Sequence, residues 1–502
     1  MTDDNSFDDY ERSLESLYEQ ADASAGMTLA STRNRRRNMV LLRKKSLEFA
    51  QFLDGDFTSI PYHMKRAFPS GYKKMPIRII NLLQQFVFDL ATLYARAPNR
   101  MFVAAQKDAG GNNRLDPAVY QKFNDIYDRS GFDSACFQGS RKLVPQQTQV
   151  FVVLPSGPRK QIIKSFSPFE VFVTPGNALT ASDIQSAAEV RIRAPVAAQD
   201  DNVLLGWMVF TPTECYWDAD GTKRSIFNLT NPQDISNPWP GTIPLAAVHA
   251  VEPPPGCFIA PLADDLYHEQ IGICLALSQI EFMARHSAPV KVIQPGQDGG
   301  LVSEQAEGLP MGADDWVALP GPGSTLAVIQ PQPMIGEYRM MIDWMTGLLA
   351  NTHNVAPDSF SKSPAAKTSV SRAYDRADRA ETRDRYKRIF EPLETQLARL
   401  VARVSNLYGP DGIVLPEDVI VNVTYQEPDD APADPVHAMQ AALMTFRTGV
   451  DSPVDYLARQ NGISTKAAED KIRANLTLWN DLSKLMPTDA MNIDAPIPKA
   501  DQ

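Results

Sequence analysis

The sequence offers little support for metal binding, disulfide formation or membrane insertion. Its 502 residues include only four cysteines, and these are widely separated without a CxxC pair, so neither a zinc site nor a disulfide framework is indicated. No apolar run approaches the ~20 residues that span a bilayer. The acidic N-terminus lacks the apolar segment of a signal peptide. We therefore expect a soluble protein made inside the cell, in a reducing compartment.

Catalytic motifs are also missing. The sequence contains no GxxxxGK[ST], no GxGxxG after a strand, no HExxH and no GxSxG. The pair His268-Glu269 lacks a second histidine at helical spacing, which favours a solvent-facing pair over a metal half-site. Paired acids such as Asp264-Asp265 fall in loops or at helix starts, whereas a two-metal nuclease needs carboxylates that converge. We expect no enzymatic activity, no metal site and no cofactor.

Charge and proline content limit the remaining classes. The net charge is −11, and the sequence contains 39 prolines. The high proline content favours many loops and short strands over an all-helical solenoid. An acidic surface repels nucleic acid as a whole. This argues against a protein that grips DNA tightly, but it is compatible with one that DNA slides past. The length predicts two to four structural units.

The first half of the chain begins with a polar tail, residues 1–30, followed by a basic cluster at residues 33–45. This cluster could be a phosphate-binding patch or the exposed face of a helix, and the second alternative is favoured. Helices are predicted at Ile77–Ala95 and Tyr120–Cys136. A β-rich region follows over residues 140–255, with one hairpin between Val150–Leu154 and Gln161–Phe166 and another across the turn at residues 218–221.

An ordered series between residues 262 and 408 is the most informative part of the chain. A helix at Leu262–Ser287 precedes a Gly/Pro-broken patch with strand character, Val290–Gln332. A second helix at Met334–Asn351 is followed by a polar loop, His353–Lys367. The series ends in one very long charged helix, Thr368–Tyr408. Such a series is typical of a wall built from repeated subunits rather than of an enclosed pocket.

The long helix alternates in charge, which predicts a face that is solvated or salt-bridged to a neighbour. Pro392 should kink it, because proline removes one backbone hydrogen bond and clashes with the preceding turn. An acidic, proline-rich linker at Gln426–Pro435 marks a boundary. Short helices then follow over residues 436–482, before a polar tail.

At these residues the chain resembles the portal, or head–tail connector, proteins of tailed bacteriophages. The resemblance runs from about Arg36 to Leu482 and rests on element order with loose motifs. Its pieces are NLLQQFVFDLATLYARAP, SPFEVFVTP, GTIPLAAVHAV, LADDLYHEQIGICLALSQIEFMARHSAPVKVI and HNVAPDSFSKSPAAKTSVSRAYDRADRAE. It implies an α+β, portal-like fold with a mixed α/β wing, a two-helix stem, a small β clip insert, a long kinked helix and an α-helical crown.

The resemblance assigns these parts to residue ranges. They are a disordered N-terminal tail (1–30), the wing (31–261), stem helix 1 (262–289), the clip (290–332), stem helix 2 (333–352), the tunnel loop (353–367), the long wing helix and a strand (368–425), the crown (436–485) and a flexible tail (486–502).

The resemblance also implies a role for particular residues. The tunnel loop would lie nearest to DNA, through Asn354, Asp358, Ser359, Phe360, Ser361, Lys362, Ser363 and Lys367. The clip would dock other proteins, through Gln297, Asp298, Glu304, Glu307, Asp314, Asp315 and Trp316. Pro392 would be the kink of the long helix.

The implied function is a ring, usually of twelve subunits, at one capsid vertex, through which double-stranded DNA is packaged and later ejected. The implied partners are the terminase large subunit, a head–tail adaptor, and the major capsid and scaffolding proteins. The implied location is the virion, and the host cytoplasm during assembly. Two alternatives remain: an oligomeric virion scaffold or adaptor without a DNA conduit, and an enzyme with an unrecognised site.

Overall fold

The computed structural model has an α+β fold, and the chain divides into two compact units, Met1–Gln426 and Glu427–Gln502. The division falls at the start of the acidic, proline-rich segment. The structure describes residues 29–69, 71–105, 115–156, 160–177, 180–197, 203–219, 221–286, 290–294, 325–329, 334–355, 369–408, 412–426, 443–444, 446–447, 452–461 and 465–483. The predicted C-terminal tail, most of the linker and residues 1–28 of the predicted N-terminal tail lie outside these ranges. The last two residues of that tail, Leu29 and Ala30, are helical, so the tail was predicted to end too late.

The first unit begins with helices α2 (Leu29–Asp54), α3 (Ile60–Ala67), the short 3-10 helix η1 (Tyr72–Lys74) and α4 (Leu82–Leu90). Helix α4 is much shorter than the predicted Ile77–Ala95. The Asn81 side chain caps it by accepting a hydrogen bond of 2.9 Å from the Gln84 N–H. The backbone just before it bonds side chains of another helix, α7 (Asp264–His286), so it does not continue α4.

The second predicted helix, Tyr120–Cys136, is in fact two helices. Helix α5 spans Pro117–Ser130 and α6 spans Phe132–Gln146. They meet at Gly131, which has a φ of +70°. Only glycine adopts this left-handed conformation readily. The apolar periodicity of the sequence continues through Gly131, although the backbone turns there and one helix ends before the next begins.

Two antiparallel sheets form the β-rich part of the first unit. The smaller sheet has the order β3-β2-β9, from β2 (Thr148–Pro155), β3 (Gln161–Phe166) and β9 (Leu245–His249). The larger has the order β4-β5-β6-β7-β8, from β4 (Val171–Pro175), β5 (Ala187–Ala197), β6 (Val203–Phe210), β7 (Cys215–Ala219) and β8 (Thr222–Ser225). A short 3-10 helix, η3 (Ile184–Ser186), precedes β5. The pairings of β2 with β3 and of β7 with β8 confirm both predicted hairpins.

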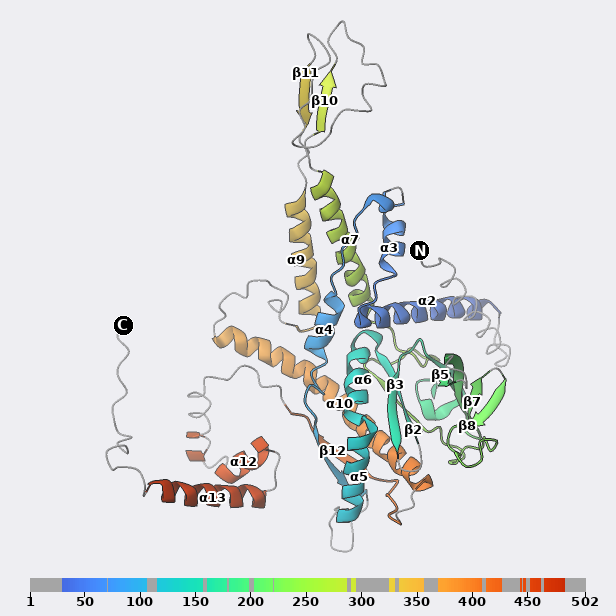
Figure 1. Cartoon of the computed structure of the whole chain (residues 1–502), viewed down its shortest axis with the longest axis vertical. Coiled ribbons are helices and arrows are strands. Elements are labelled where there is room, and N and C mark those ends of the chain that lie inside the picture. The colour runs from blue at the N-terminus through green and yellow to red at the C-terminus, as the bar shows by residue number, and fades with distance from the viewer. Residues whose placement is uncertain are drawn as a thin grey trace. The chain divides into compact units, whose positions relative to one another are not determined.

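A long helix, α10 (Ser369–Leu407), connects this sheet region to the rest of the unit (Figure 1). It packs against β2, β9 and β12 (Ile420–Thr424), and β12 pairs with the distant strand β1 (Asn99–Val103). Its buried side chains, including Phe390, Leu397 and Val401, belong to the main core of the unit. Helix α10 passes Pro392 without a break, and the kink at this residue stays a prediction.

The charged face of α10 is predicted to be solvated or salt-bridged to a neighbour rather than buried. Glu394 is salt-bridged, to Arg100, but its side chain is 0 % exposed, so the prediction that this face is not buried is wrong at this residue. Arg100 donates to this carboxylate from Nε at 2.8 Å and from a terminal nitrogen at 2.9 Å, and the Tyr94 hydroxyl donates to it at 2.9 Å. Burial lowers the pKa of Arg100, but the bond to Glu394 and its negative charge outweigh this effect and raise that pKa overall. Arg383 on the same helix is also buried.

The surroundings of this ion pair are aromatic. The Arg100 guanidinium lies 4.7 Å from the ring centre of Phe132 and 5.3 Å from that of Tyr127. Burial, and then the charge of Glu394, raise the pKa of the Tyr94 hydroxyl and of the Cys136 thiol, so both groups stay neutral at neutral pH. The ion pair therefore links β1 to α10 inside the core.

The favoured interpretation of the basic cluster is wrong at Arg43, and so is its alternative. The Arg43 side chain is buried, and it donates to the backbone carbonyl of Val171 at 2.7 Å and to that of Pro168 at 3.2 Å. Its guanidinium lies 3.6 Å from the ring centre of Phe172. Lys45 bonds Asp264 at 2.8 Å. These two cations hold α2 against β4 and the start of α7.

The second unit contains helices α12 (Pro453–Asn461) and α13 (Thr465–Ser483). These helices confirm that the C-terminal region is helical. Ser452 caps α12, accepting a hydrogen bond of 3.0 Å from the Asp455 N–H. The helices pack against each other, and Ala468 is buried.

Candidate functional site

The predicted pair of helices flanking a small β insert is present. Helix α7 and helix α9 (Ile335–Thr352) lie side by side (Figure 1). Strands β10 (Val290–Gln294) and β11 (Thr325–Ile329) between them pair antiparallel. Cys274 in α7 is buried. Asp264 and Asp265 lie in the first turn of α7, where the positive end of the helix dipole stabilises carboxylates.

Two contacts set the register of this pair. Asp265 lies 2.7 Å from the Nε2 atom of His353, and this hydrogen bond lowers the pKa of Asp265. Seven residues further along α7, the Met345 methyl approaches Gly272 so closely that a Cβ added there would lie 3.8 Å from it. Residue numbers thus rise along α7 as they fall along α9, so the two helices are antiparallel.

Helix α9 ends at the root of the predicted tunnel loop. Asn354 has a φ of +54°, a conformation that asparagine tolerates better than most residues. Val355 then turns inward: its side chain is buried, and its N–H bonds the Ala350 carbonyl at 2.9 Å. The core cluster around Val355 includes Leu83 and Leu266. The loop therefore departs from a fixed point rather than from a frayed helix end.

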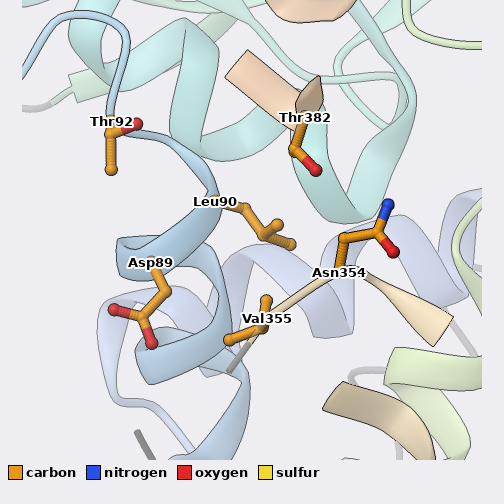
Figure 2. A pocket seen from close by; sticks show the side chains of 6 residues that line it. All are labelled: Asp89, Leu90, Thr92, Asn354, Val355 and Thr382. Atoms are coloured by element: carbon orange, nitrogen blue, oxygen red, sulfur yellow. The ribbon is translucent and has the colours of Figure 1, made fainter. Parts of the chain in front are cut away.

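A small cavity lies at this root, between α4, the end of α9 and α10 (Figure 2). Its volume is about 10 Å³, close to what a single water molecule requires. Figure 2 shows its lining, which is Asp89, Leu90, Thr92, Asn354, Val355 and Thr382. It is too small for a substrate or cofactor, so it is a packing junction that fixes where the loop begins.

Most of the predicted site residues lie outside the described ranges. This holds for the loop residues Asp358, Ser359, Phe360, Ser361, Lys362, Ser363 and Lys367, and for the clip residues Gln297, Asp298, Glu304, Glu307, Asp314, Asp315 and Trp316. Asn354 is described, at the root of the loop, and Pro392 is exposed on α10. The roles assigned to all of them stay predictions.

Sequence reasoning missed two exposed apolar surfaces beside this helix pair. On α9 the exposed residues are Met340, Met341, Trp344 and Leu348, and Trp344 is 67 % exposed. In the segment before α4 they are Ile77, Ile79 and Ile80. A signal existed in α9, because MIGEYRMMIDWMTGLL is apolar around most of its circumference. Such a helix is normally buried on all sides.

The parts of the chain that the structure describes show no group of three or more His, Cys, Asp or Glu side chains able to hold a metal ion. All four cysteines are free thiols, three of them buried. Within the same parts, every helix is too short or too polar to cross a bilayer.

No family model matches the sequence, and no curated protein matches it. Solved structures do. One, described as the neck of an empty gene transfer agent particle computed with C6 symmetry, has a TM-score of 0.41 and 12 % identity and covers 81 % of this chain and 93 % of its own. The neck of the native particle, computed with C12 symmetry, has a TM-score of 0.38 and 13 % identity and covers 73 % and 85 %.

A portal protein of the HK97 phage family from Corynebacterium diphtheriae has a TM-score of 0.32 and 8 % identity, and covers 72 % of this chain and 93 % of its own. The similar solved structures thus include one phage portal protein, a member of the family that the sequence resembles. At these scores the likeness carries no functional argument. The function proposed below rests on the residues of this chain.

Proposed function

We propose that this chain is the subunit of a portal ring, the head–tail connector at one vertex of a tailed-phage capsid. In this role α7 and α9 form the stem, β10 and β11 belong to the clip, and residues 356–367 form the loop nearest to DNA. The ring, of about twelve copies by the family resemblance, conducts double-stranded DNA during packaging and ejection. We assign no catalytic step to it.

The observation that carries the proposal is the helix pair with its uncovered apolar surfaces. Trp344 and Met340 are 67 % and 65 % exposed on the outside of α9. Large exposed apolar patches mark interaction sites, because a monomer gains nothing from presenting them to water. A ring in which each subunit covers the next removes this surface from solvent.

The proposed loop suits a conduit better than a DNA-binding site. Over residues 353–367 the sequence has only two lysines, Lys362 and Lys367, with Asp358 nearby. Each contact between a cation and a phosphate adds salt-dependent affinity. Few contacts per subunit allow the duplex to touch the loop and still slide.

Electron microscopy of the purified chain in negative stain tests this function. We expect closed rings viewed down an axis, with a central hole wide enough for a DNA duplex. Oligomers without such a hole would favour the scaffold or adaptor alternative. A chain that stays monomeric, alone and in assembled particles, would contradict the proposal.

A separate prediction concerns the clip. Replacing Trp316 with alanine is expected to weaken docking of terminase or adaptor by about 2 kcal/mol, the loss typical of an aromatic anchor at the centre of an interface. Ring formation should be unchanged, because the stem helices are untouched. The readout is a pull-down of each partner by assembled rings. Glu252→Ala, an exposed position outside the clip, is the matched control. Unchanged docking by the Trp316 variant would remove this residue from the docking surface.

A further inference from the structure

Helix α7 is covered on one face by the segment that precedes α4. The Arg78 N–H donates to the Ser278 hydroxyl at 2.9 Å, and the Arg78 guanidinium pairs with Glu281. Gln270 donates to the Ile80 carbonyl of the same segment at 2.7 Å and accepts from the N–H of Leu83, in the first turn of α4, at 2.9 Å. Residues 270, 274, 278 and 281 share one side of a helix. Residues 77–81 therefore lie flat along that side.

The opposite face of α7 contacts α9. Asp265 and Gly272, which contact His353 and Met345, are seven residues apart and so lie on one side of the helix. At about 100° per residue, this side is turned roughly 160–180° from that of Cys274. Helix α7 is thus the middle layer of three, with α9 on one side and residues 77–81 on the other.

Both outer layers present apolar side chains to solvent. On α9, Met340, Met341, Trp344 and Leu348 fall within a sector of about 100° that points away from α7; we call these four residues the α9 stripe. They are 65 %, 42 %, 67 % and 53 % exposed. On the other side, Ile77, Ile79 and Ile80 are 47 %, 49 % and 47 % exposed; we call these three the isoleucine strip.

The two surfaces also lie at the same height along α7. Because Gly272 contacts Met345 and the helices are antiparallel, Trp344 lies level with residue 273 of α7. Ile80 bonds Gln270, which is about one helical turn from residue 273 along α7. Met340 and Met341 are level with residues 276–277, next to Ser278, which bonds the residue after Ile77. If a second chain is related to the first by rotation about an axis parallel to α7, the α9 stripe of one chain can meet the isoleucine strip of the other without any shift along that axis.

Charge at the edge of the two surfaces is complementary. Glu337 is exposed and continues the α9 stripe one turn before Met340 and Met341, level with residue 280. Arg78 lies beside the isoleucine strip at that level, paired with Glu281, and its side chain is 60 % exposed. An acid on one surface and a base on the other, at equal height, indicate a partner that carries both surfaces.

We propose that the occupant of each surface is a second copy of this chain: the α9 stripe of one subunit packs on the isoleucine strip of the next. This contact is head-to-tail, because the two surfaces differ and lie on opposite sides of α7, and a contact of this kind closes into a ring when the rotation per subunit fits. The inference rests on the proposed function and specifies its interface.

Cysteine cross-linking tests the pairing. A chain with Ile80→Cys and Trp344→Cys is expected to form a ladder of covalent oligomers under mild oxidation. Either substitution alone should give none, since the contact joins different residues. Cys257→Ser removes the one native thiol that is not buried. Ile77→Cys with Leu348→Cys is the matched control: these positions differ in height by about 14 Å, beyond the Cα separation of about 7 Å that a disulfide allows.

A second variant covers the case in which the cysteines disturb folding. Trp344→Glu is expected to weaken association about thirtyfold, as for an aromatic anchor at an interface centre. Its position is exposed, so the monomer should fold normally. Arg339→Glu, exposed on α9 but outside the stripe, should assemble as the unmodified chain does. Molar mass by light scattering and far-UV circular dichroism give the two readouts.

The outcomes of these experiments distinguish the proposed contact between the α9 stripe and the isoleucine strip from the formation of a ring as such. Rings in the microscope with no ladder from the double-cysteine chain would overturn the pairing and leave the portal function standing. Cross-links from Trp344→Cys alone would show a symmetric contact and also overturn it. Failure of the unmodified chain to form any ring would overturn the proposed function as well.

Discussion

Replacing Glu394 with glutamine is expected to lower the free energy of unfolding by about 3–5 kcal/mol, the loss typical of a buried ion pair that keeps only one charge. The side chain is fully buried and accepts hydrogen bonds from Arg100 and Tyr94. Glutamine keeps the shape but cannot neutralise the guanidinium, whose remaining carboxylate partner, Asp133, is half-exposed. Urea unfolding followed by circular dichroism measures the change.

The control for this prediction is Glu391→Gln, one turn earlier on the same helix and exposed. It should change stability by no more than about 0.5 kcal/mol, as surface substitutions usually do. Equal effects at the two positions would mean that the Arg100 pair contributes no more than a surface charge.

Replacing both members of the ion pair distinguishes the attraction between Arg100 and Glu394 from the cost of burying their charges. With methionine at both Arg100 and Glu394, no buried charge is left unpaired, because the other partner of Arg100, Asp133, is half-exposed to water. Replacing a whole buried ion pair by apolar residues is often nearly neutral. We expect the double variant to be more stable than Glu394→Gln. If it were less stable, the attraction within the pair would outweigh the desolvation of its members.

The order of elements could be predicted from sequence because local patterns determine it. Apolar periodicity with flanking proline and glycine predicts α7 and α9 to within two or three residues. Two strand-like runs, split by the proline- and glycine-containing residues 155–158, predict the β2–β3 hairpin. The errors came where tertiary contacts decide. Residues 77–80 have a helical pattern but bond α7 instead, and Gly131 turns the chain inside a continuous pattern.

The burial of charged residues could not be predicted in the same way. Arg43 and Glu394 stand in runs of charge that are typical of a solvated helix face. Their partners lie far away in the sequence: Val171 is 128 residues from Arg43, and Arg100 is 294 residues from Glu394. Sequence periodicity gives no information about a partner so far away. A buried charged residue within a charged run therefore cannot be distinguished, from sequence, from its exposed neighbours.

The predicted tunnel loop, His353–Lys367, begins too early in the sequence, because its first residues are fixed in the structure. Val355 falls within the predicted loop because it follows polar residues and lies two residues before Pro357. In the structure it is 4 % exposed and belongs to the core around α4 and α7. A deletion of Val355–Ala366, which the sequence alone suggests as a test, would remove a core residue and confuse loss of function with loss of folding.

Replacing residues 357–367 with glycine and serine of equal length is therefore the sharper experiment, and it keeps Val355 and the connection to α10. We expect rings to assemble normally, because α7, α9 and the buried core are unchanged. In a phage that depends on this chain, we expect most particles to lack packaged DNA or to lose it. The measurements are DNA per particle and ring formation in the microscope.

A second arm tests whether charge in the loop matters. Lys362→Ala with Lys367→Ala removes both lysines of the loop and keeps its length. Each cation that contacts a phosphate changes the salt dependence of binding by about one unit of slope, so this variant should alter the salt sensitivity of DNA retention more than ring assembly. Because the glycine-serine chain lacks the same lysines, DNA loss in it alone would assign the role to the shape of the loop. Normal packaging and retention in both variants would remove the loop from the DNA path.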